Sequence, residues 1–395
     1  MNVPQLRFSG FDGEWETVSL GKLGDFTKGM ALSKADISEE GEPCILYGEL
    51  YTKYGPVINQ VQSRTNSNQS KRVLGTKNDV LIPSSGETAI DIACASALEA
   101  ENVLLGGDLN IFRPKENVSG VFLSYQINGV RKFKLSKLAQ GASVVHLYSN
   151  SLKKFKVKIP TYEEQQKIAN LLKSLDRKIE KQQEKVETLE QYKKGMVQKI
   201  FSQELRFKDE DDVEFPEWEM KKLDKCLDIE NGFPFKSSYF TTESLGMPLL
   251  RIRDIKAEKL NTYYTGSFDE KYLVDNQDII IGMDGEFAVS KWDKGPALLN
   301  QRVMRIKSKE EYSLSYLYQL LKIVVKKIED ITPKTTVKHL SNKDIFNTVV
   351  EMPSFDEQLK IGNFFSDIDT KIGKEKDKLM VLEEQKKGLM QVMFV

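Results

Sequence analysis

Cysteine and histidine are scarce in this chain of 395 residues, and their scarcity excludes several kinds of site. The three cysteines, Cys44, Cys94 and Cys226, are widely spaced and form no CxxC pair. This spacing argues against zinc ribbons and against a disulfide framework, so we interpret them as buried thiols. The two histidines have no acidic or cysteine partner at the spacing of a metal site. We therefore expect no bound metal.

Motifs of catalysis are missing as well. The sequence holds no NPPY or DPPY tetrapeptide of the kind that amino-methyltransferases use, and no GxGxxG or FxGxG loop for adenosylmethionine. A GxxxxGKS or GxxxxGKT phosphate loop is also absent, and the carboxylates fall in no nuclease arrangement. We therefore predict a chain with neither a catalytic site nor a cofactor.

Long apolar runs are missing too. The opening MNVPQLRFSG has no apolar core, and no stretch of 18 apolar residues follows, so we expect a cytoplasmic protein without membrane contact. With 40% hydrophobic and 29% charged residues, the composition is that of a globular protein with charge-rich helices. The length allows two or three domains.

The net charge is zero, which at first argues against nucleic acid as a partner. Residues 1–159 carry 19 basic against 16 acidic side chains, and residues 204–352 carry 23 against 27. A neutral average still permits a basic face, because DNA responds to the local patch rather than to the total. The balance predicts modest DNA binding by this chain alone.

The chain contains an internal repeat. Residues 160–201 align without a gap to residues 353–394, with about 18 of 42 positions identical. The stretches before the two repeats, residues 1–159 and 204–352, are here called heads, and they match only at scattered landmark residues. These landmarks are Leu6-Arg7-Phe8 with Leu205-Arg206-Phe207, Trp15-Glu16 with Trp218-Glu219, Gly29 with Gly232, Asp79–Ile82 with Asp278–Ile281, and His146 with His339. A duplicated scaffold with divergent heads indicates one molecule that reads two different things.

Each repeated tail is predicted to be a long helix. Thr161 with Glu164, and Ser354 with Glu357, have the spacing of capping boxes at the helix start. A heptad seam then follows, with eight of ten positions apolar in each copy and both polar exceptions at matching registers. The seam positions are Ile168, Leu172, Leu175, Ile179, Gln182, Val186, Leu189, Lys193, Met196 and Ile200, and then Ile361, Phe365, Ile368, Ile372, Glu375, Leu379, Leu382, Lys386, Leu389 and Met393.

This pattern predicts a coiled coil in which the polar positions fix the register. The alternative is two surface helices, each packed on its own head. Antiparallel pairing would relate the two halves by an approximate two-fold axis, whereas parallel pairing would place both heads at one end. The sequence decides neither, although the two-fold arrangement makes better use of a duplication.

Each head is predicted to be α+β with irregular loops. Strands are expected at 44–50, 79–83, 103–113, 154–159, 248–253, 277–282, 302–307 and 346–352, and helices at 121–138 and 313–329.

These landmarks, taken together, resemble the specificity subunit of type I restriction–modification systems. The pattern of L-R-F…W at the start of a head, His-Leu near its end, and Pro followed by an EEQ or DEQ helix start occurs twice, in order and at matching spacing. The resemblance covers nearly the whole chain. It implies two target recognition domains of mixed α/β structure with a twisted β-sheet, at 1–159 and 204–352. It also implies an antiparallel coiled coil made by the helices of 160–203 and 353–395.

The resemblance further implies a function and partners. Each head would read one half of a bipartite, asymmetric site in double-stranded DNA, and the coiled coil would set the gap between the halves. Two methyltransferase subunits would dock on this frame and methylate adenine at N6, and restriction subunits would join through them. The chain itself would be non-catalytic.

Candidate DNA contacts are chosen for groove-reaching loops and for side chains with paired donors and acceptors. For most of them a solvated surface role, and for the glycine loops an ordinary turn, is an equal alternative. The two histidines, next to the junctions of head and helix, are interpreted as structural. The candidates are Tyr47, Arg64, Lys71, Arg72, Ser84, Ser85, Gly86, Glu87 and Thr88 in the first head, and Arg251, Arg253 (alternating on an expected strand), Asp284, Gly285, Glu286, Gln301 and Arg302 in the second.

Two other functions stay open at this point. A coiled-coil adaptor would bind proteins through its heads and show no DNA sequence preference. A self-sufficient methyltransferase or nuclease with unrecognised motifs would bind adenosylmethionine by itself.

Overall fold

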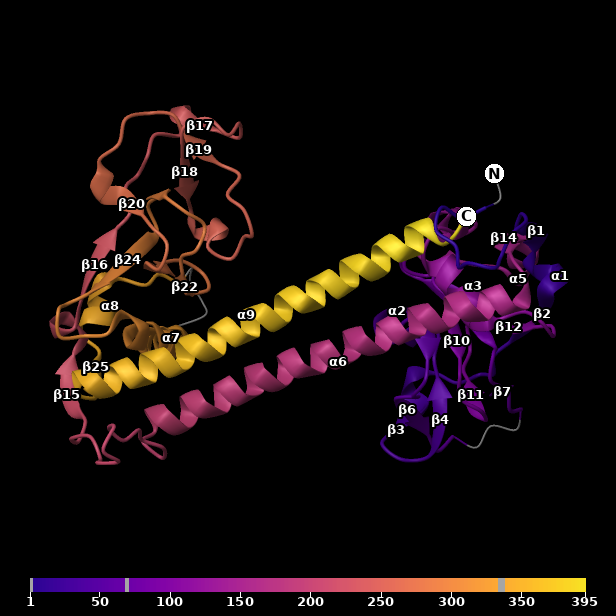
Figure 1. Cartoon of the computed structure of the whole chain (residues 1–395), viewed down its shortest axis with the longest axis horizontal. Helices are drawn as coiled ribbons and strands as arrows, with labels where there is room; N and C mark the ends of the chain where they lie inside the picture. Colours follow the sequence, from indigo (N-terminus) through magenta and orange to yellow (C-terminus); the bar gives the residue numbers. More distant parts are fainter. Residues whose placement is uncertain (1–2, 68–70, 333–337) are drawn as a thin grey trace. The chain divides into compact units, whose positions relative to one another are not determined.

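The computed structural model describes residues 3–67, 71–332 and 338–395, and it divides into two compact units. Unit 1 comprises residues 1–185 and 375–395, and unit 2 comprises residues 186–374. Each unit contains one head and parts of both long helices, α6 (Tyr162–Phe201) and α9 (Phe355–Val392) (Figure 1). The sequence predicted four segments, at 1–159, 160–203, 204–352 and 353–395, and this division stays a prediction.

The head of unit 1 is built on two five-stranded sheets, with strand orders β2-β12-β8-β10-β5 and β3-β6-β4-β11-β7. Two further pairs, β1-β14 and β13-β9, complete the sheet structure described there. The strands are β1 (Glu16–Ser19), β2 (Gly24–Lys28), β3 (Ile37–Ser38), β4 (Glu42–Ile45), β5 (Val57–Ile58), β6 (Ser63–Thr65), β7 (Leu74–Gly75), β8 (Val80–Pro83), β9 (Ser85–Gly86), β10 (Ser96–Leu98), β11 (Val103–Leu105), β12 (Leu109–Pro114), β13 (Val145–His146) and β14 (Lys156–Ile159). The helices are α1 (Leu20–Leu23), α2 (Glu49–Thr52), α3 (Gly120–Asn128), α4 (Lys132–Ser136) and α5 (Ser149–Lys154).

The head of unit 2 repeats this plan in its sheet orders, β15-β25, β16-β24-β21-β22 and β17-β19-β18-β23-β20. Its strands are β15 (Glu219–Lys222), β16 (Leu227–Asn231), β17 (Phe240–Thr241), β18 (Met247–Leu250), β19 (Tyr263–Tyr264), β20 (Leu273–Val274), β21 (Ile279–Gly282), β22 (Val289–Lys291), β23 (Ala297–Leu299), β24 (Val303–Ser308) and β25 (Val349–Met352). The helices are α7 (Leu314–Ile331) and α8 (Asn342–Phe346). The duplication expected from scattered landmarks therefore extends to the strand order of the heads.

Several predicted elements need correction. The expected strand 44–50 ends at Ile45, and α2 follows because the buried Glu49 accepts a hydrogen bond from the Leu46 amide at 2.9 Å. The expected strand 103–113 is two strands, β11 and β12, joined by a turn. The expected helix 121–138 is interrupted at Gly129, where a Cβ atom would lie 2.8 Å from Cε of Met390 in α9. Only the break at Gly129 is accompanied by a contact with a segment distant in sequence.

The long helices run antiparallel inside each unit. In unit 1, Asp176 and Gln182 of α6 contact Lys386 and Glu375 of α9, so residue numbers rise along one helix as they fall along the other. In unit 2, Lys193 contacts Asp369 at 2.5 Å, and the rings of Phe201 and Phe365 stack at 6.5 Å. The antiparallel prediction is confirmed, and the parallel alternative is wrong.

The polar seam positions pair as register-setting residues should. The Gln182 amide donates to the Glu375 carboxylate at 2.7 Å and to its backbone carbonyl at 2.8 Å. Lys386 and Lys193 each reach an aspartate of the facing helix at 2.5 Å. A shift of one heptad would separate these pairs, so they favour a single register.

The apolar seam positions divide into two groups. Most of those near either end of each helix are buried in the core of a head as well, so helix packing on the head and helix pairing occur together. The buried members of the predicted seam are Ile168, Leu172, Leu175, Val186, Ile200, Ile361, Phe365, Ile368, Ile372 and Met393, and the half-buried ones are Ile179, Leu189, Met196, Leu379, Leu382 and Leu389.

Acid should weaken the helix pair at Glu375. Hydrogen bonds from Gln182, Lys378 and Lys185 lower the pKa of Glu375 to about 2, compared with about 4.3 in an unfolded chain. A carboxylate with a depressed folded pKa contributes stability that is present above the unfolded pKa and is lost as pH falls through the folded value. We expect the difference in unfolding free energy between the wild type and Glu375→Gln to shrink between pH 5 and pH 2. Denaturant unfolding at several pH values measures it, and a constant difference would contradict the assignment.

Each head is tied to the start of its own helix by a repeated buried ion pair. In unit 1, the Arg7 guanidinium donates to both oxygens of Glu164 at 2.7 Å, and Glu164 is fully buried. In unit 2, Arg206 donates to both oxygens of Glu357 at 3.3 and 2.9 Å. The capping box predicted at Ser354 is formed in part, because the Glu357 amide donates to the Ser354 hydroxyl at 3.4 Å. The carboxylates of Glu164 and Glu357 pair with the arginine of the L-R-F motif instead of closing the box.

The neighbouring glutamines complete this junction. Gln165 accepts from the Ser119 amide at 2.9 Å and donates to the Pro160 carbonyl at 3.0 Å. Gln358 makes the same bonds to Ser313 and Pro353, at 3.0 and 2.9 Å. The repeated Pro, Glu and Gln thus position each head on a long helix.

Candidate nucleic-acid interface

Three predicted loops of unit 2 come together around Asp284. Its carboxylate lies 2.7 Å from Nδ1 of His339 and 3.5 Å from Nε of Arg302, and Nη1 of Arg302 lies 3.4 Å from Nδ1 of His339. All three side chains are partly exposed, by 29% for Asp284, 45% for His339 and 55% for Arg302. A carboxylate, an imidazole and a guanidinium thus offer adjacent donors and acceptors at a surface, as base readout requires.

The backbone holds this cluster in place. The Met283 amide donates to the Arg302 carbonyl at 2.9 Å, and the Gly285 amide donates to Lys338 at 3.1 Å. Arg302 has a φ of 71°, which is uncommon for a residue other than glycine. The main chain is therefore fixed while the side chains remain accessible.

The segment after β18 also reaches this surface, but not as a strand. Residues 252–254 form a 3₁₀ turn, so the predicted alternation of Arg251 and Arg253 on a strand is wrong. Arg251 folds back on Asp254 at 2.8 Å, whereas Arg253 is exposed. Lys256 then pairs with Glu286 at 2.9 Å, which places this turn beside the loop of Gly285 and Glu286.

The matching loop of unit 1 is largely a buried strand. Ser84 and Ser85 are 6% and 5% exposed, and Gly86 is also buried. β9 pairs with β13, so that Ser85 faces His146 as Asp284 faces His339. The prediction of a flexible groove-reaching loop is therefore corrected for residues 84–86, because pairing with a strand about 60 residues away buries them.

The exposed part of this loop begins at Glu87. Thr88 is exposed as well, and its hydroxyl contacts Asp91. Burial and the neighbouring Tyr47, Glu87 and Asp91 raise the pKa of Tyr51. Tyr51 therefore lies near two of the predicted DNA contacts, Tyr47 and Glu87. Tyr47 itself is half-buried.

The remaining candidates of unit 1 form a separate group near β4 and β6. Arg64 is exposed on β6 and donates to the Gly41 carbonyl at 2.8 Å. Arg72 pairs with Glu42 of β4, and Lys71 is exposed. Gln301 of unit 2 is also exposed, directly before Arg302. Within the described part of the chain, no hydrogen bond or ion pair joins Arg64, Lys71 or Arg72 to Glu87 or Thr88.

The sequence reasoning missed the residue that corresponds to Arg302. Asp108 occupies the same turn of unit 1, with a φ of 56°, and its carbonyl accepts from the Ser84 amide at 2.7 Å. It is exposed, and its charge acts on Lys28. The two heads therefore carry opposite charges on the same backbone position. The spacing from the DVLI or DIII strand to this turn differs between the heads, 29 residues from Asp79 to Asp108 and 24 from Asp278 to Arg302, so spacing along the chain could not identify it.

The two histidines lie at matched positions in different surroundings. His339 lies in the exposed Asp284 cluster, and its structural role stays a prediction. His146 is half-buried, and its ring lies 6.0 Å from that of Tyr148, which is 50% exposed.

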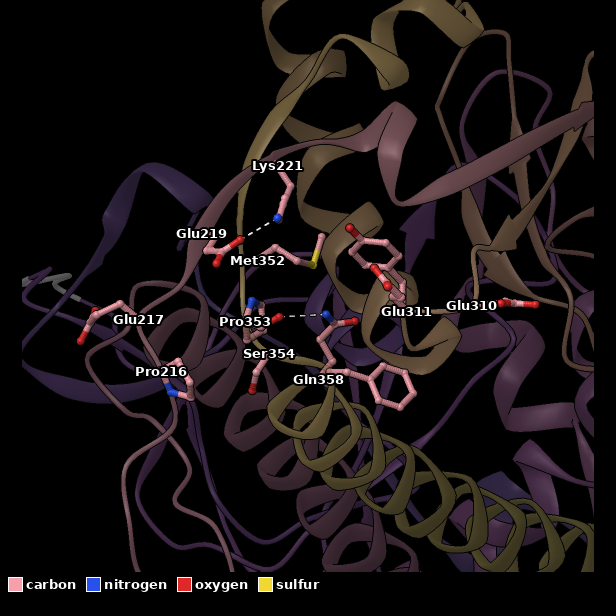
Figure 2. A pocket seen from close by; sticks show the side chains of 12 residues that line it. Pro216, Glu217, Glu219, Lys221, Glu310, Glu311, Met352, Pro353, Ser354 and Gln358 are labelled. Atoms are coloured by element: carbon pink, nitrogen blue, oxygen red, sulfur yellow. Dashed lines mark hydrogen bonds and ion pairs between the residues drawn. The ribbon is translucent and has the colours of Figure 1, made fainter.

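A different hollow of unit 2 lies at the junction of head and helix and is unsuited to DNA. Its lining includes Glu217, Glu219, Glu310 and Glu311, together with Lys221 (Figure 2). Lys221 pairs with Glu219 at 2.6 Å and Arg206 pairs with Glu217 at 3.6 Å, so Glu310 and Glu311 leave the hollow negative. Because phosphates carry the same sign, the charge of this hollow disfavours a DNA contact here.

No group of three or more histidine, cysteine, aspartate or glutamate side chains in residues 3–67, 71–332 and 338–395 could hold a metal ion. The cysteines are buried, as predicted, and burial raises the pKa of Cys44 to about 11 and of Cys94 to about 12. Among the described segments, no helix has both the length and the apolar character needed to cross a membrane.

Known proteins are similar to this chain in sequence and in fold. The family "Type I restriction modification DNA specificity domain" matches twice, at residues 12–191 and 216–384. The EcoBI specificity subunit of Escherichia coli is 41% identical over 142 residues, which are 36% of this chain and 30% of that protein. The MjaVIII specificity subunit of Methanocaldococcus jannaschii is 25% identical over 96% of this chain and 92% of its own length.

A solved structure has the same fold. The crystal structure of the type I restriction–modification S subunit from M. genitalium superposes with a TM-score of 0.69 at 19% identity, covering all of this chain and 99% of that one. Two copies of the family domain cover most of the sequence, and the chain belongs to the type I restriction–modification DNA specificity family.

Proposed function

We propose that this chain is the DNA-recognition subunit of a type I restriction–modification complex. Each head reads one half of a bipartite site, and the paired helices set the gap between the halves. The observation that carries the proposal is a repeated backbone frame with different side chains, in which Ser85 and Asp108 of one head correspond to Asp284 and Arg302 of the other. Different side chains on one frame would read different bases, so the site would be asymmetric.

The chain itself is proposed to be non-catalytic and to act through partners. Methyltransferase subunits, two per chain if each repeat binds one, would methylate adenine in each half-site, and restriction subunits would join that assembly. The repeated junctions at Glu164 and Glu357 support this stoichiometry, because they present the same frame twice. The family membership does not favour the adaptor alternative.

Single-molecule methylome sequencing of the source genome, with and without the gene, tests the proposal. Loss of N6-methyladenine at one bipartite, asymmetric motif is the expected result, and it would report both half-sites at once. If methylation is restored by the wild-type gene at a palindromic or unsplit motif, the two-head mechanism is wrong.

The DNA contact of unit 2 is tested by Arg302→Ala. A side chain that reads a base supplies about 1–3 kcal/mol of discrimination, so the variant should bind the cognate duplex about 5- to 150-fold more weakly. Glu310→Gln in the acidic hollow is the control and should leave DNA affinity unchanged. Fluorescence anisotropy of the methyltransferase-bound complex at fixed salt measures both variants. Equal affinities for wild type and Arg302→Ala would remove this residue from the interface.

A further inference from the structure

Unit 2 has an aromatic cleft that lies next to the Asp284 cluster. The cleft is lined by Phe233, Phe235, Phe268 and Tyr272, with Ser267, Asp269 and Lys271 as its polar members. Phe233 is 42% exposed, whereas Phe235 is only 7% exposed and anchors the wall in the core. The ring of Phe233 lies 5.2 Å from Phe235 and 5.0 Å from Tyr272, so one face of the cleft is continuous aromatic surface.

The backbone joins this cleft to the candidate interface. Phe233 forms a β-bridge with Asn300, and its carbonyl accepts from the Gln301 amide at 3.0 Å. Gln301 is followed by Arg302, whose side chain belongs to the Asp284 cluster. The exposed Phe233 ring therefore belongs to a residue whose backbone is bonded to Gln301, the neighbour of Arg302. Arg302 is the residue that contacts DNA in the proposed function.

Unit 1 shows that the fold itself does not require this exposed ring. Met30 occupies the matched position, since its amide donates to Leu105 as that of Phe233 donates to Leu299. Met30 is 4% exposed and Leu32, the counterpart of Phe235, is 6% exposed. The same backbone can thus bury its side chains, so the exposed ring at this position distinguishes the second head from the first.

We infer that this cleft receives a nucleobase, with Phe233 as the stacking surface; the inference rests on the proposed function. Every base has a π-face that stacks on an aromatic ring, and apolar side chains beside a groove unstack base steps by insertion. Lys271, whose Nζ lies 5.0 Å from the Tyr272 ring centre, pairs with Asp269 at 2.9 Å and so places an exposed ion pair at the rim. The Ser267 hydroxyl and this ion pair offer donors and acceptors to a base edge or to the adjoining phosphate.

The inference predicts that only the half-site read by unit 2 is locally unstacked. The test uses the full-length chain bound to its methyltransferase partner, on duplexes with 2-aminopurine placed in turn along each half-site, away from the methylated adenine. At saturating protein, wild type should raise the fluorescence at one position of the half-site that responds to Arg302→Ala. Phe233→Ala should abolish that increase and weaken binding about 5- to 150-fold, the range that base–aromatic stacking supplies.

Two controls separate the explanations. Phe233→Trp should keep the signal, because it preserves the stacking surface. Tyr239→Ala removes another exposed ring of the same head, 47% exposed and outside the cleft, and should change neither readout. If wild type binds its motif but Phe233→Ala leaves fluorescence and affinity unchanged, the inference is wrong while the proposed function stands. If Phe233→Ala instead releases the methyltransferase partner, the cleft is a protein contact and the inference is also wrong. If wild type binds no motif selectively, the proposed function itself fails.

Discussion

Replacing Arg206 with alanine is expected to lower the free energy of unfolding by about 3–5 kcal/mol, because it leaves a buried charge without its partner. Glu357 has no exposed side-chain surface, and Arg206 supplies hydrogen bonds to both of its oxygens. The Trp218 indole donates the remaining bond at 3.0 Å and cannot neutralise the carboxylate. Urea unfolding of the full-length chain, followed by circular dichroism, measures the loss.

A matched surface pair supplies the control. Lys208 and Asp212 lie 3.3 Å apart with side-chain exposures of 46% and 86%, so Lys208→Ala should change stability by less than about 1 kcal/mol. The double variant Arg206→Met with Glu357→Gln should recover part of the loss, since it removes the buried charge along with its partner. Equal effects of Arg206→Ala and Lys208→Ala would show that the junction pair is no more than a surface contact.

Phe365→Ala should be comparably destabilising, by about 3–5 kcal/mol, because it empties a site where helix and head share one core. The ring is fully buried, 5.3 Å from Phe364 and 6.5 Å from Phe201. Phe201 belongs to the facing helix, so the variant weakens the attachment of α9 to the head of unit 2 and its pairing with α6 together. Thermal and urea unfolding of the full chain would measure this effect.

Leu379 is the comparison for Phe365 in the same helix and the same heptad pattern. It is half-buried, so Leu379→Ala should cost clearly less than Phe365→Ala. If both variants lose the same stability, the seam acts as a uniform coiled coil and the division into core and seam positions is wrong. If Phe365→Ala costs less than about 1 kcal/mol, the shared core is not formed in solution.

The long helices and the duplication could be predicted from the sequence because their signals are local and repeated. A heptad pattern over about 40 residues, with matching polar positions at Gln182 and Glu375, specifies a helix and its partner without reference to the heads. The buried strands β8 and β21 were equally visible as short runs of branched apolar residues.

The recognition surface was less accessible to sequence reasoning. Ser84–Gly86 has the composition of a flexible loop, yet it is buried through pairing with residues 145–146. Arg251 was expected to face outward from a strand, but the local turn at 252–254 directs it onto Asp254. In the first case a contact distant in sequence decided the outcome, and in the second a local turn did.

The sequence by itself determined the family, the two-fold repeat and the helical seam, because these depend on periodicity and on spacing along the chain. Only the tertiary structure decided which polar residues share a surface. Asp284, Arg302 and His339 come from segments 18 to 55 residues apart, and they meet because β21 and β24 pair and residues 283–285 bond to residues 338–340. Met30 and Phe233 occupy the same backbone position in the two heads but differ in side-chain exposure. This exposure depends on the neighbours that fill the core, and spacing along the chain does not determine it.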